Sequence, residues 1–340
     1  MIYRSKAPLR IGLAGGGTDV SPYSDKFGGA ILNATVSLFA YANIELLEEN
    51  KIIVHALDRK EEQKFDWMTE LPIDGTLDLL KGVYNRIQKD YGIPETGFRL
   101  STFVDAPAGS GLGTSSTLVV AIIGAFVEWL KLPLGDYDIA HYAYQIERND
   151  LKLSGGKQDQ YAAMFGGVNF MEFYEDDKVI VNPLRIKPQY LHELENNLVL
   201  YFTSTSRESA AIINEQVKNV NNKNEKSIEA MHQLKEQARM MKEALLTGKL
   251  DQFGEILDFG FMQKRRMAHN ISNSRIEEIY EAAKKAGATG GKISGAGGGG
   301  FMIFYCPRNT HHAVVEELHK FGGEIKNYTF TEYGLTTWCA

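Results

Sequence analysis

Cysteine is scarce in this sequence, which has only Cys306 and Cys339 among its 340 residues. Two cysteines make no disulfide framework, and their positions match no zinc-binding spacing. Long apolar runs are missing as well: no stretch of about 18 apolar residues occurs, and the first residues hold no signal-peptide core. We therefore expect a cytoplasmic protein with no structural metal and no membrane partner.

Positive charge is not in excess, since 37 Lys and Arg face 43 Asp and Glu, for a formal net charge of −6. Nucleic-acid-binding proteins usually carry clustered Lys and Arg, so we expect no nucleic-acid partner. Small anions stay open as ligands, because backbone amides and a few cations bind phosphate whatever the overall charge. The eight histidines include no H-E-x-x-H pair of the metalloenzyme kind.

The size and the element pattern indicate a two-domain α+β enzyme. A mass of 38.0 kDa exceeds what one hydrophobic core usually serves. Strand patterns occur at residues 9–14, 41–46, 52–57, 98–104, 198–203 and 301–305. Helix patterns occur at residues 115–130, 138–149, 228–245 and 276–285. The two kinds of element are mixed without strict alternation, which favours α+β over a doubly wound parallel sheet. We place the domains at residues 1–185 and 186–340.

A glycine-rich turn, PAGSGLGTSST at residues 107–117, leads into the buried helix that follows it. Glycines let the backbone approach a ligand closely, and amides at a helix N-terminus attract phosphate. Alone, the segment is as typical of a turn with a hydroxyl N-cap. No G-x-x-x-x-G-K-[ST] pattern occurs, so this is not a Walker loop. The predicted ATP-binding residues are Pro107, Gly109, Ser110, Gly111, Leu112, Gly113, Thr114, Ser115 and Ser116.

Two further glycine clusters favour the phosphate-binding interpretation. KISGAGGGG, at residues 292–300, is dense in glycine although each one costs roughly 0.5–1 kcal/mol of stability. A strand pattern follows it, whereas a Rossmann fingerprint would be followed by a helix. The other cluster, residues 15–17, leads from a strand pattern into Thr18 and Asp19.

In this order the three clusters resemble the three motifs of the GHMP family, named for its galactose, homoserine, mevalonate and phosphomevalonate kinases. APLRIGLAGGGTD at residues 7–19 resembles the first motif, PAGSGLGTSS at 107–116 the second, and KISGAGGGGF at 292–301 the third. The resemblance implies a kinase of the two-domain GHMP fold. Its N-terminal domain would be ribosomal-S5-like and its C-terminal domain ferredoxin-like, with ATP and substrate between them.

The resemblance also implies catalytic and metal-binding residues. Asp159 would accept the proton of the acceptor hydroxyl, with Arg10 beside it as the neutralising cation. Ser115 and Glu147 match the hydroxyl and the carboxylate that hold Mg²⁺ in the family. Without the family pattern, Asp159 is as typical of a helix N-cap and Glu147 of a solvated helix position.

For the acceptor, Thr18 and Asp19 match the segment by which galactokinases bind sugar hydroxyls, and Gly297 and Gly298 are further candidates. Three successive cations, residues 264–266, are candidates to bind a phosphate on the acceptor. We choose Lys264 and Arg265 among them, since successive helical residues point about 100° apart and not all three can face one cleft. A solvated basic helix face is the alternative.

Within the family, residues 158–173 and 264–300 are most similar to the bacterial kinases of D-glycero-D-manno-heptose 7-phosphate. This similarity implies that ATP and Mg²⁺ serve to phosphorylate the anomeric hydroxyl of that sugar, giving the 1,7-bisphosphate for nucleotide-activated heptose synthesis. Two alternatives stay open: a fucokinase-like sugar 1-kinase and a catalytically silent sensor of sugar and ATP. The sequence also leaves open which anomer of the sugar is used and whether the protein forms a homodimer.

Overall fold

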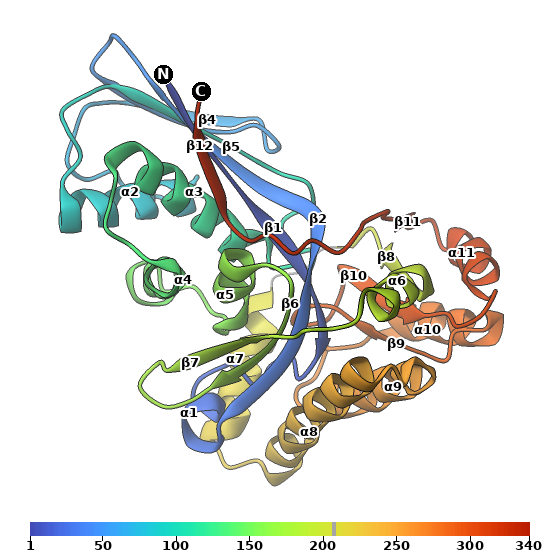
Figure 1. Ribbon diagram of the computed structural model, residues 1–340. Helices are drawn as coiled ribbons and strands as arrows, with labels where there is room; N and C mark the ends of the chain where they lie inside the picture. Colours follow the sequence, from blue (N-terminus) through green and yellow to red (C-terminus); the bar gives the residue numbers. More distant parts are fainter. Residues whose placement is uncertain (206–208) are drawn as a thin grey trace.

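Two β-sheets with helices packed around them make up the computed structural model, which describes residues 1–205 and 209–340 (Figure 1). The first sheet has the order β12-β1-β2-β5-β3-β4, and β6 joins β7 to the other end of β2. Its strands are β1 (Ile2–Ala14), β2 (Gly29–Leu46), β3 (Lys51–Ala56), β4 (Glu61–Asp66), β5 (Phe98–Val104), β6 (Val168–Phe173), β7 (Val179–Pro183) and β12 (Thr336–Cys339). All its pairings are antiparallel except β3 with β5.

Most helices of the N-terminal half cover one face of this sheet (Figure 1). They are α2 (Asp78–Tyr91), α3 (Thr114–Leu130), α4 (Asp136–Gln145), a π-helical turn (Ile146–Asp150) and α5 (Gln158–Phe165), whereas the short α1 (Tyr23–Phe27) packs against the second half. Helix α3 is apolar on all sides because it lies between the sheet and its neighbouring helices. The helix predicted over residues 138–149 corresponds to α4 and the π-turn that continues it.

The second sheet is antiparallel with the order β11-β8-β10-β9. Its strands are β8 (Leu198–Phe202), β9 (Gly290–Ile293), β10 (Phe301–Tyr305) and β11 (Glu324–Ile325). The accompanying helices are α6 (Pro188–Asn197), α7 (Ser209–Asn221), α8 (Glu225–Thr247), a 3₁₀ turn (Leu250–Gln252), α9 (Phe253–Lys264), α10 (Ser274–Ala286) and α11 (His311–His319). Helix α8 ends at Gly248 as predicted, with φ of 72°. This mixture of helices and antiparallel strands confirms the α+β class.

The long strands β1 and β2 serve both halves of the molecule. Around Ala7 and Ala42 they pack against α3, whereas β1 from Leu9 onward and β2 up to Leu38 contribute to a second core. That second core joins Leu9 and Ile11 of β1 to α8, α9 and the second sheet, and it is fully buried. Burial of this shared apolar surface holds the two halves together.

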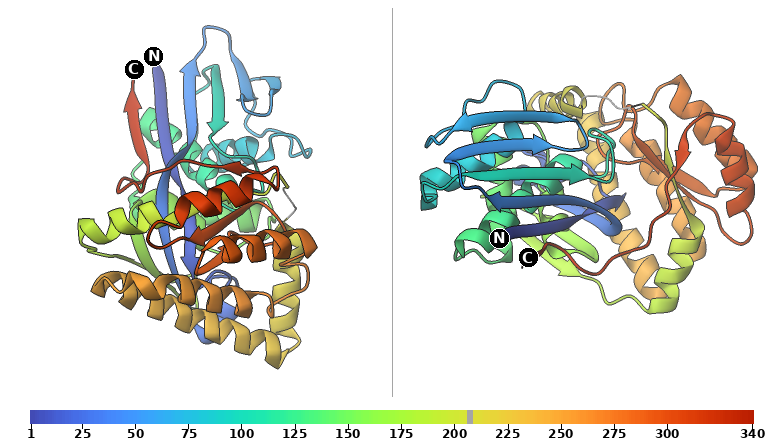
Figure 2. Two further views of the ribbon diagram at one scale, coloured as in Figure 1. Left: turned by 90° about the vertical axis from the view of Figure 1, so that its right-hand side faces the viewer. Right: turned by 90° about the horizontal axis from the view of Figure 1, so that it is seen from above.

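The C-terminal segment returns to the first sheet. Strand β12 pairs with β1 from Tyr3 opposite Cys339 to Lys6 opposite Thr336, and Figure 2 shows the two termini side by side. The predicted boundary assigns these residues to the second domain. The chain leaves the first sheet between β7 and α6, on either side of residue 185, and a boundary there stays a prediction.

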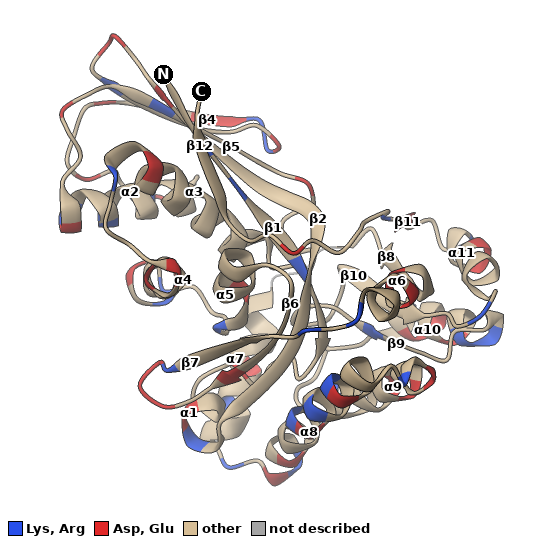
Figure 3. Ribbon diagram, in the orientation of Figure 1, with Lys and Arg blue, Asp and Glu red and all other residues tan. Residues whose placement is uncertain are grey.

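Charges of both signs alternate along the outer helices, as Figure 3 shows for α8. Within the described ranges, no helix combines the length and the hydropathy needed to span a bilayer.

Candidate active site

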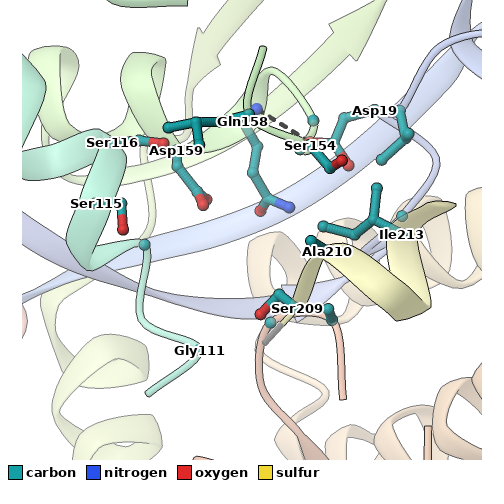
Figure 4. Close-up of a pocket in the computed structure, with 18 of the residues that line it drawn as sticks. Asp19, Gly111, Ser115, Ser116, Ser154, Gln158, Asp159, Ser209, Ala210 and Ile213 are labelled. Carbon is teal, nitrogen blue, oxygen red and sulfur yellow. Dashed lines mark hydrogen bonds between the residues drawn. The ribbon is translucent and has the colours of Figure 1, made fainter. Parts of the chain in front are cut away.

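The main cleft lies between the two halves. The end of β1, the loop before α3, the π-turn and the start of α5 line it from one side. Helix α7, the end of α9 and the glycine-rich loop after β9 line it from the other. Figure 4 shows Gln158, Asp159 and Asp19 bordering this space, with Ala210 and Ile213 of α7 across from them.

Asp159 and Arg10 form the ion pair that the prediction required. Arg10 donates from Nε and Nη2 to Oδ1 of Asp159, at 2.7 and 2.6 Å, and from Nη1 to the Gly111 carbonyl at 2.6 Å. The Arg10 side chain is 4% exposed, whereas that of Asp159 is 23% exposed and opens into the cleft. Oδ2 of Asp159 lies near the start of α3, 3.3 Å from the point a Cβ would occupy at Gly113. A carboxylate oxygen thus faces the loop that precedes α3.

The N-terminus of α5 is capped by Asp19, not by Asp159. Asp19 Oδ2 accepts hydrogen bonds from the backbone N–H groups of Lys157 and Gln158, at 2.9 and 3.1 Å (Figure 4). Burial raises the pKa of Asp19, and the nearby Asp159 raises it further. Thr18, in contrast, does not line the cleft: its hydroxyl donates to the carbonyls of Gly15 and Ala30 and closes the turn.

Most of the predicted ATP-binding residues line the cleft. These are Gly109, Gly111, Gly113, Thr114, Ser115 and Ser116. Three of the predicted residues do not line the cleft: Pro107, Ser110 and Leu112. The backbone of Ser110 and Leu112 instead anchors the loop to neighbouring strands. The Leu112 carbonyl accepts from the Arg10 backbone N–H at 3.1 Å, and the Ser110 carbonyl accepts from that of Phe301 at 2.8 Å.

The second and third glycine motifs pack backbone against backbone. Gly111 has φ of 87°, and a Cβ there would lie 2.7 Å from the Ser294 carbonyl oxygen. The Ser294 hydroxyl donates to the Gly111 carbonyl at 2.7 Å, so the two motifs are also joined by a hydrogen bond. Gly297 and Gly298 lie further along, where the Gly298 N–H donates to the Ile271 carbonyl at 2.8 Å. Neither belongs to the lining of the cleft.

Glu147, in the π-turn, is buried beside the N-terminus of α3. Ser116 Oγ donates to its Oε1 at 3.0 Å, and Gln160 donates to both Ser116 and Glu147. Burial raises the pKa of Glu147. Ser115, the predicted hydroxyl ligand, lines the same part of the cleft and is exposed. The hydroxyl in contact with Glu147 is thus that of Ser116.

These oxygens fit Mg²⁺, which prefers hard ligands and often takes only one or two from the protein beside phosphate oxygens and water. In the part of the chain that the structure describes, no cluster of three or more His, Cys, Asp or Glu could hold a metal alone. The fit therefore depends on phosphate oxygens as partners.

Of the three successive cations, only Lys264 faces the cleft. Its Nζ donates to the Gly295 carbonyl, and burial together with the nearby Arg10 lowers its pKa to about 8. Arg265 lies on the other side of the helix end, with its guanidinium 4.0 Å from the centre of the Phe261 ring and 2.9 Å from Glu277 Oε2. Arg266 is exposed.

Several cleft residues escaped the sequence prediction. Arg148 donates to the carbonyls of Leu153 and Gly156, at 3.3 and 3.2 Å, and orders the loop before α5. Lys292 is buried behind the cleft and donates from Nζ to the Gly12 carbonyl at 2.6 Å. Burial lowers its pKa well below the usual range. Lys292 opens the third motif and could have been noticed there, but the α7 residues belong to no motif.

The cleft brings together three features: a glycine-rich helix N-terminus, a carboxylate paired with arginine, and side-chain oxygens of the kind that bind Mg²⁺. Such groups are typical of the active sites of phosphoryl-transfer enzymes. Comparison with known proteins agrees. Residues 78–167 match the GHMP kinases N terminal domain and residues 241–324 the GHMP kinases C terminal domain. The chain belongs to the GHMP kinase family, whose members use ATP as the phosphate donor, and it is a phosphotransferase with a hydroxyl acceptor.

Two relatives are similar over nearly their whole length. The D-glycero-alpha-D-manno-heptose 7-phosphate kinase of Campylobacter jejuni is 47% identical over 335 residues, 98% of each chain. The crystal structure of a D-glycero-D-manno-heptose 1-phosphate kinase from Bacteroides thetaiotaomicron is 46% identical, with a TM-score of 0.85 over 99% of both chains. A mevalonate kinase structure, 21% identical with a TM-score of 0.75, shows the shared fold.

Proposed function

We propose that this protein transfers the γ-phosphoryl group of ATP to the anomeric hydroxyl of D-glycero-D-manno-heptose 7-phosphate, giving the 1,7-bisphosphate for nucleotide-activated heptose synthesis. The observation that carries the proposal is the 47% identity, over 98% of both chains, with a kinase named for this sugar phosphate. The cytoplasm is the proposed location, in keeping with two free cysteines.

The names of the two similar kinases place the substrate's phosphate differently, on carbon 7 in one and on carbon 1 in the other. Phosphorylation of O1 in the first sugar or of O7 in the second would yield the same bisphosphate. Product analysis alone therefore cannot separate the two reactions, and the starting sugar phosphates must be compared. We choose O1 because the sequence also resembles sugar kinases that act at the anomeric position.

Asp159 accepts the proton of the attacking hydroxyl in this proposal. Arg10 holds Oδ1, which leaves Oδ2 directed toward the start of α3, where the nucleotide phosphates would bind. As the hydroxyl oxygen bonds to the γ-phosphorus, the bond to the bridging oxygen of the β-phosphate breaks and ADP leaves. Proton transfer to a positioned base typically contributes about 10²–10⁴-fold in rate.

The backbone N–H groups of the loop before α3 bind the phosphates, and the helix N-terminus supplies partial positive charge. Gly111 and Gly113, with φ of 87° and 78°, let this backbone adopt a left-handed conformation, and they let Ser294 and Asp159 pack directly against the loop. Arg10 lies beside the same loop through its contact with the Gly111 carbonyl, and so it also faces the group in transfer.

Glu147, Ser116 and Ser115 would hold Mg²⁺, which neutralises charge on the phosphates when it is bound. Gln160 orients Glu147 from behind by donating to its carboxylate.

Lys264 binds the phosphate that the acceptor already carries. Among residues 264–266 it is the cation that lines the cleft, while Arg265 is engaged by Glu277 and by aromatic rings. A charge-assisted hydrogen bond to phosphate contributes about 1.5–3 kcal/mol. Burial of a charged ammonium group costs free energy unless an anion pairs with it, and the phosphate of the acceptor would be that anion.

ADP release from ATP against a panel of acceptors tests the proposal. The panel holds heptose 7-phosphate, heptose 1-phosphate, unphosphorylated heptose, fucose, galactose and mevalonate. We expect heptose 7-phosphate to be used with the highest kcat/KM. Equal or better use of fucose would replace the proposal by a fucokinase-like activity, and absence of ADP release with every acceptor would indicate a silent sensor.

A further inference from the structure

Gln216 lies on α7 at a position where the helix pattern would place an apolar residue. Ile212 and Val220, one turn before and after it, are buried in the core of the second half. Gln216 is buried to the same degree, with 3% of its surface exposed. It also continues the side of α7 that borders the cleft, where Figure 4 shows Ala210 and Ile213. The helix therefore presents an amide at the boundary between core and cleft.

The Gln216 side chain makes no hydrogen bond to any residue in the described ranges, although a buried amide normally has partners. Two other buried glutamines have partners within the protein. Gln160 donates to Ser116 and Glu147, although its Oε1 accepts no hydrogen bond from the described residues. Gln237 donates to the Ile256 carbonyl at 3.0 Å and accepts from the Gly15 N–H at 3.1 Å. Of these three, Gln216 lines the cleft, so an amide with no partner among the described residues borders the space where a ligand would bind.

Helix α7 is held in place on both sides of Gln216. The neighbouring Glu215 accepts from both the backbone N–H and the ring of His269, and the Asn219 amide donates to the Met267 carbonyl at 2.9 Å. On the opposite side of the cleft, the Ser154 hydroxyl donates to Asn214 at 2.7 Å. These contacts tie α7 to the loop after α9 and to the loop before α5, so the amide is preorganised for a ligand.

The residues around Gln216 indicate which ligand. A Cβ at Gly17 would lie 3.5 Å from Gln216 Oε1, and Gly17 belongs to the motif that leads to Asp19. Asp19 and Lys264 line the same cleft. Asp19 and Lys264 are the groups that we assign to the acceptor. An amide, which both donates and accepts, is complementary to a hydroxyl.

We propose that Gln216 is a specificity-determining residue that binds a hydroxyl group of the acceptor sugar. The inference rests on the proposed function for the identity of that sugar. When the sugar binds, the amide gains the partners that it lacks among the described residues. A sugar without that hydroxyl would leave the buried amide unpaired, and the cleft would discriminate against it.

The test is Gln216→Met, which keeps the side chain's length but removes its hydrogen-bonding groups. The matched control is Gln237→Met, since Gln237 is equally buried but has its partners within the protein. Calorimetry measures the Kd values for ATP and for the acceptor, and thermal unfolding measures stability. We expect Gln216→Met to raise the acceptor Kd roughly 5- to 50-fold, to leave the ATP Kd unchanged, and to keep or raise Tm. Gln237→Met should lower Tm and leave the ratio of the two Kd values unchanged.

A series of monodeoxy acceptors gives the decisive readout. For one of them, wild type and Gln216→Met should bind with the same Kd, because the hydroxyl that Gln216 recognises is gone. Unchanged acceptor affinity in Gln216→Met, or equal weakening toward every deoxy sugar, would overturn the inference. If the wild type binds fucose and not heptose phosphate, the proposed function fails, while a Gln216 effect confined to one fucose hydroxyl would still support the role of Gln216.

Discussion

Replacing Asp159 by asparagine changes one oxygen of the proposed catalytic group and little else. Arg10 donates two hydrogen bonds to Oδ1, at 2.7 and 2.6 Å. The asparagine carbonyl will keep that position, since its NH₂ group would meet the guanidinium as donor against donor. The NH₂ group then replaces Oδ2, the oxygen that faces the loop before α3. A group that cannot accept the substrate's proton thus stands where the base was.

The expected loss in kcat is about 10²–10⁴-fold, the usual contribution of a positioned general base. The Kd for ATP should stay near its wild-type value, because the proposed nucleotide contacts lie in the loop and not on Asp159. The matched control is Asp90→Asn. Asp90 accepts from Arg86 Nε at 2.6 Å and has a side chain 31% exposed, but it does not line the cleft. Single-turnover rates and ATP titrations on both variants provide the comparison. Wild-type kcat in Asp159→Asn, or an equal loss in Asp90→Asn, would refute the assignment.

Three further predictions follow from the cleft. Gly111→Ala should lower the free energy of unfolding by at least about 1 kcal/mol and weaken ATP binding, since φ is 87° and a Cβ would lie 2.7 Å from a carbonyl oxygen; denaturant titration checks it. Glu147→Gln and Ser115→Ala should raise the Mg²⁺ concentration for half-maximal rate, with an unchanged Mg²⁺ titration counting against the metal site. Lys264 has a pKa of about 8, so kcat/KM for the phosphorylated sugar should fall as pH rises past 8, and Lys264→Arg should remove this fall because arginine stays protonated. A fall in kcat/KM that persists in Lys264→Arg would exclude Lys264 as its cause.

The site residues that could be predicted from the sequence belong to short motifs. Glycines at 109, 111 and 113 stand out because few folds tolerate such density without a ligand, and all three have a positive φ. The family pattern also pointed to Arg10 and Asp159, which lie 149 positions apart and which no local rule could have paired. Helix geometry predicted that not all of residues 264–266 face the cleft, and only the tertiary contacts show that Lys264 is the one.

What the sequence could not show depends on contacts made after the chain folds. The first turn of α3 offers two adjacent serines, and only the folded structure shows that Ser116 contacts Glu147. Gln216 belongs to no motif, and its significance is visible only from its burial at the cleft without a partner among the described residues. Strand β12 is short, and its pairing with β1 joins the two ends of the chain, a contact that local propensity does not report.

The central claim is that this cleft forms a second phosphate ester on a heptose phosphate at the expense of ATP. Its most direct test is a ³¹P NMR spectrum of the purified protein with ATP, Mg²⁺ and heptose 7-phosphate. We predict that ADP appears in step with a new phosphate signal coupled to the anomeric proton, while the original 7-phosphate signal persists. Unchanged ATP and sugar, or inorganic phosphate in place of the anomeric ester, would contradict the account.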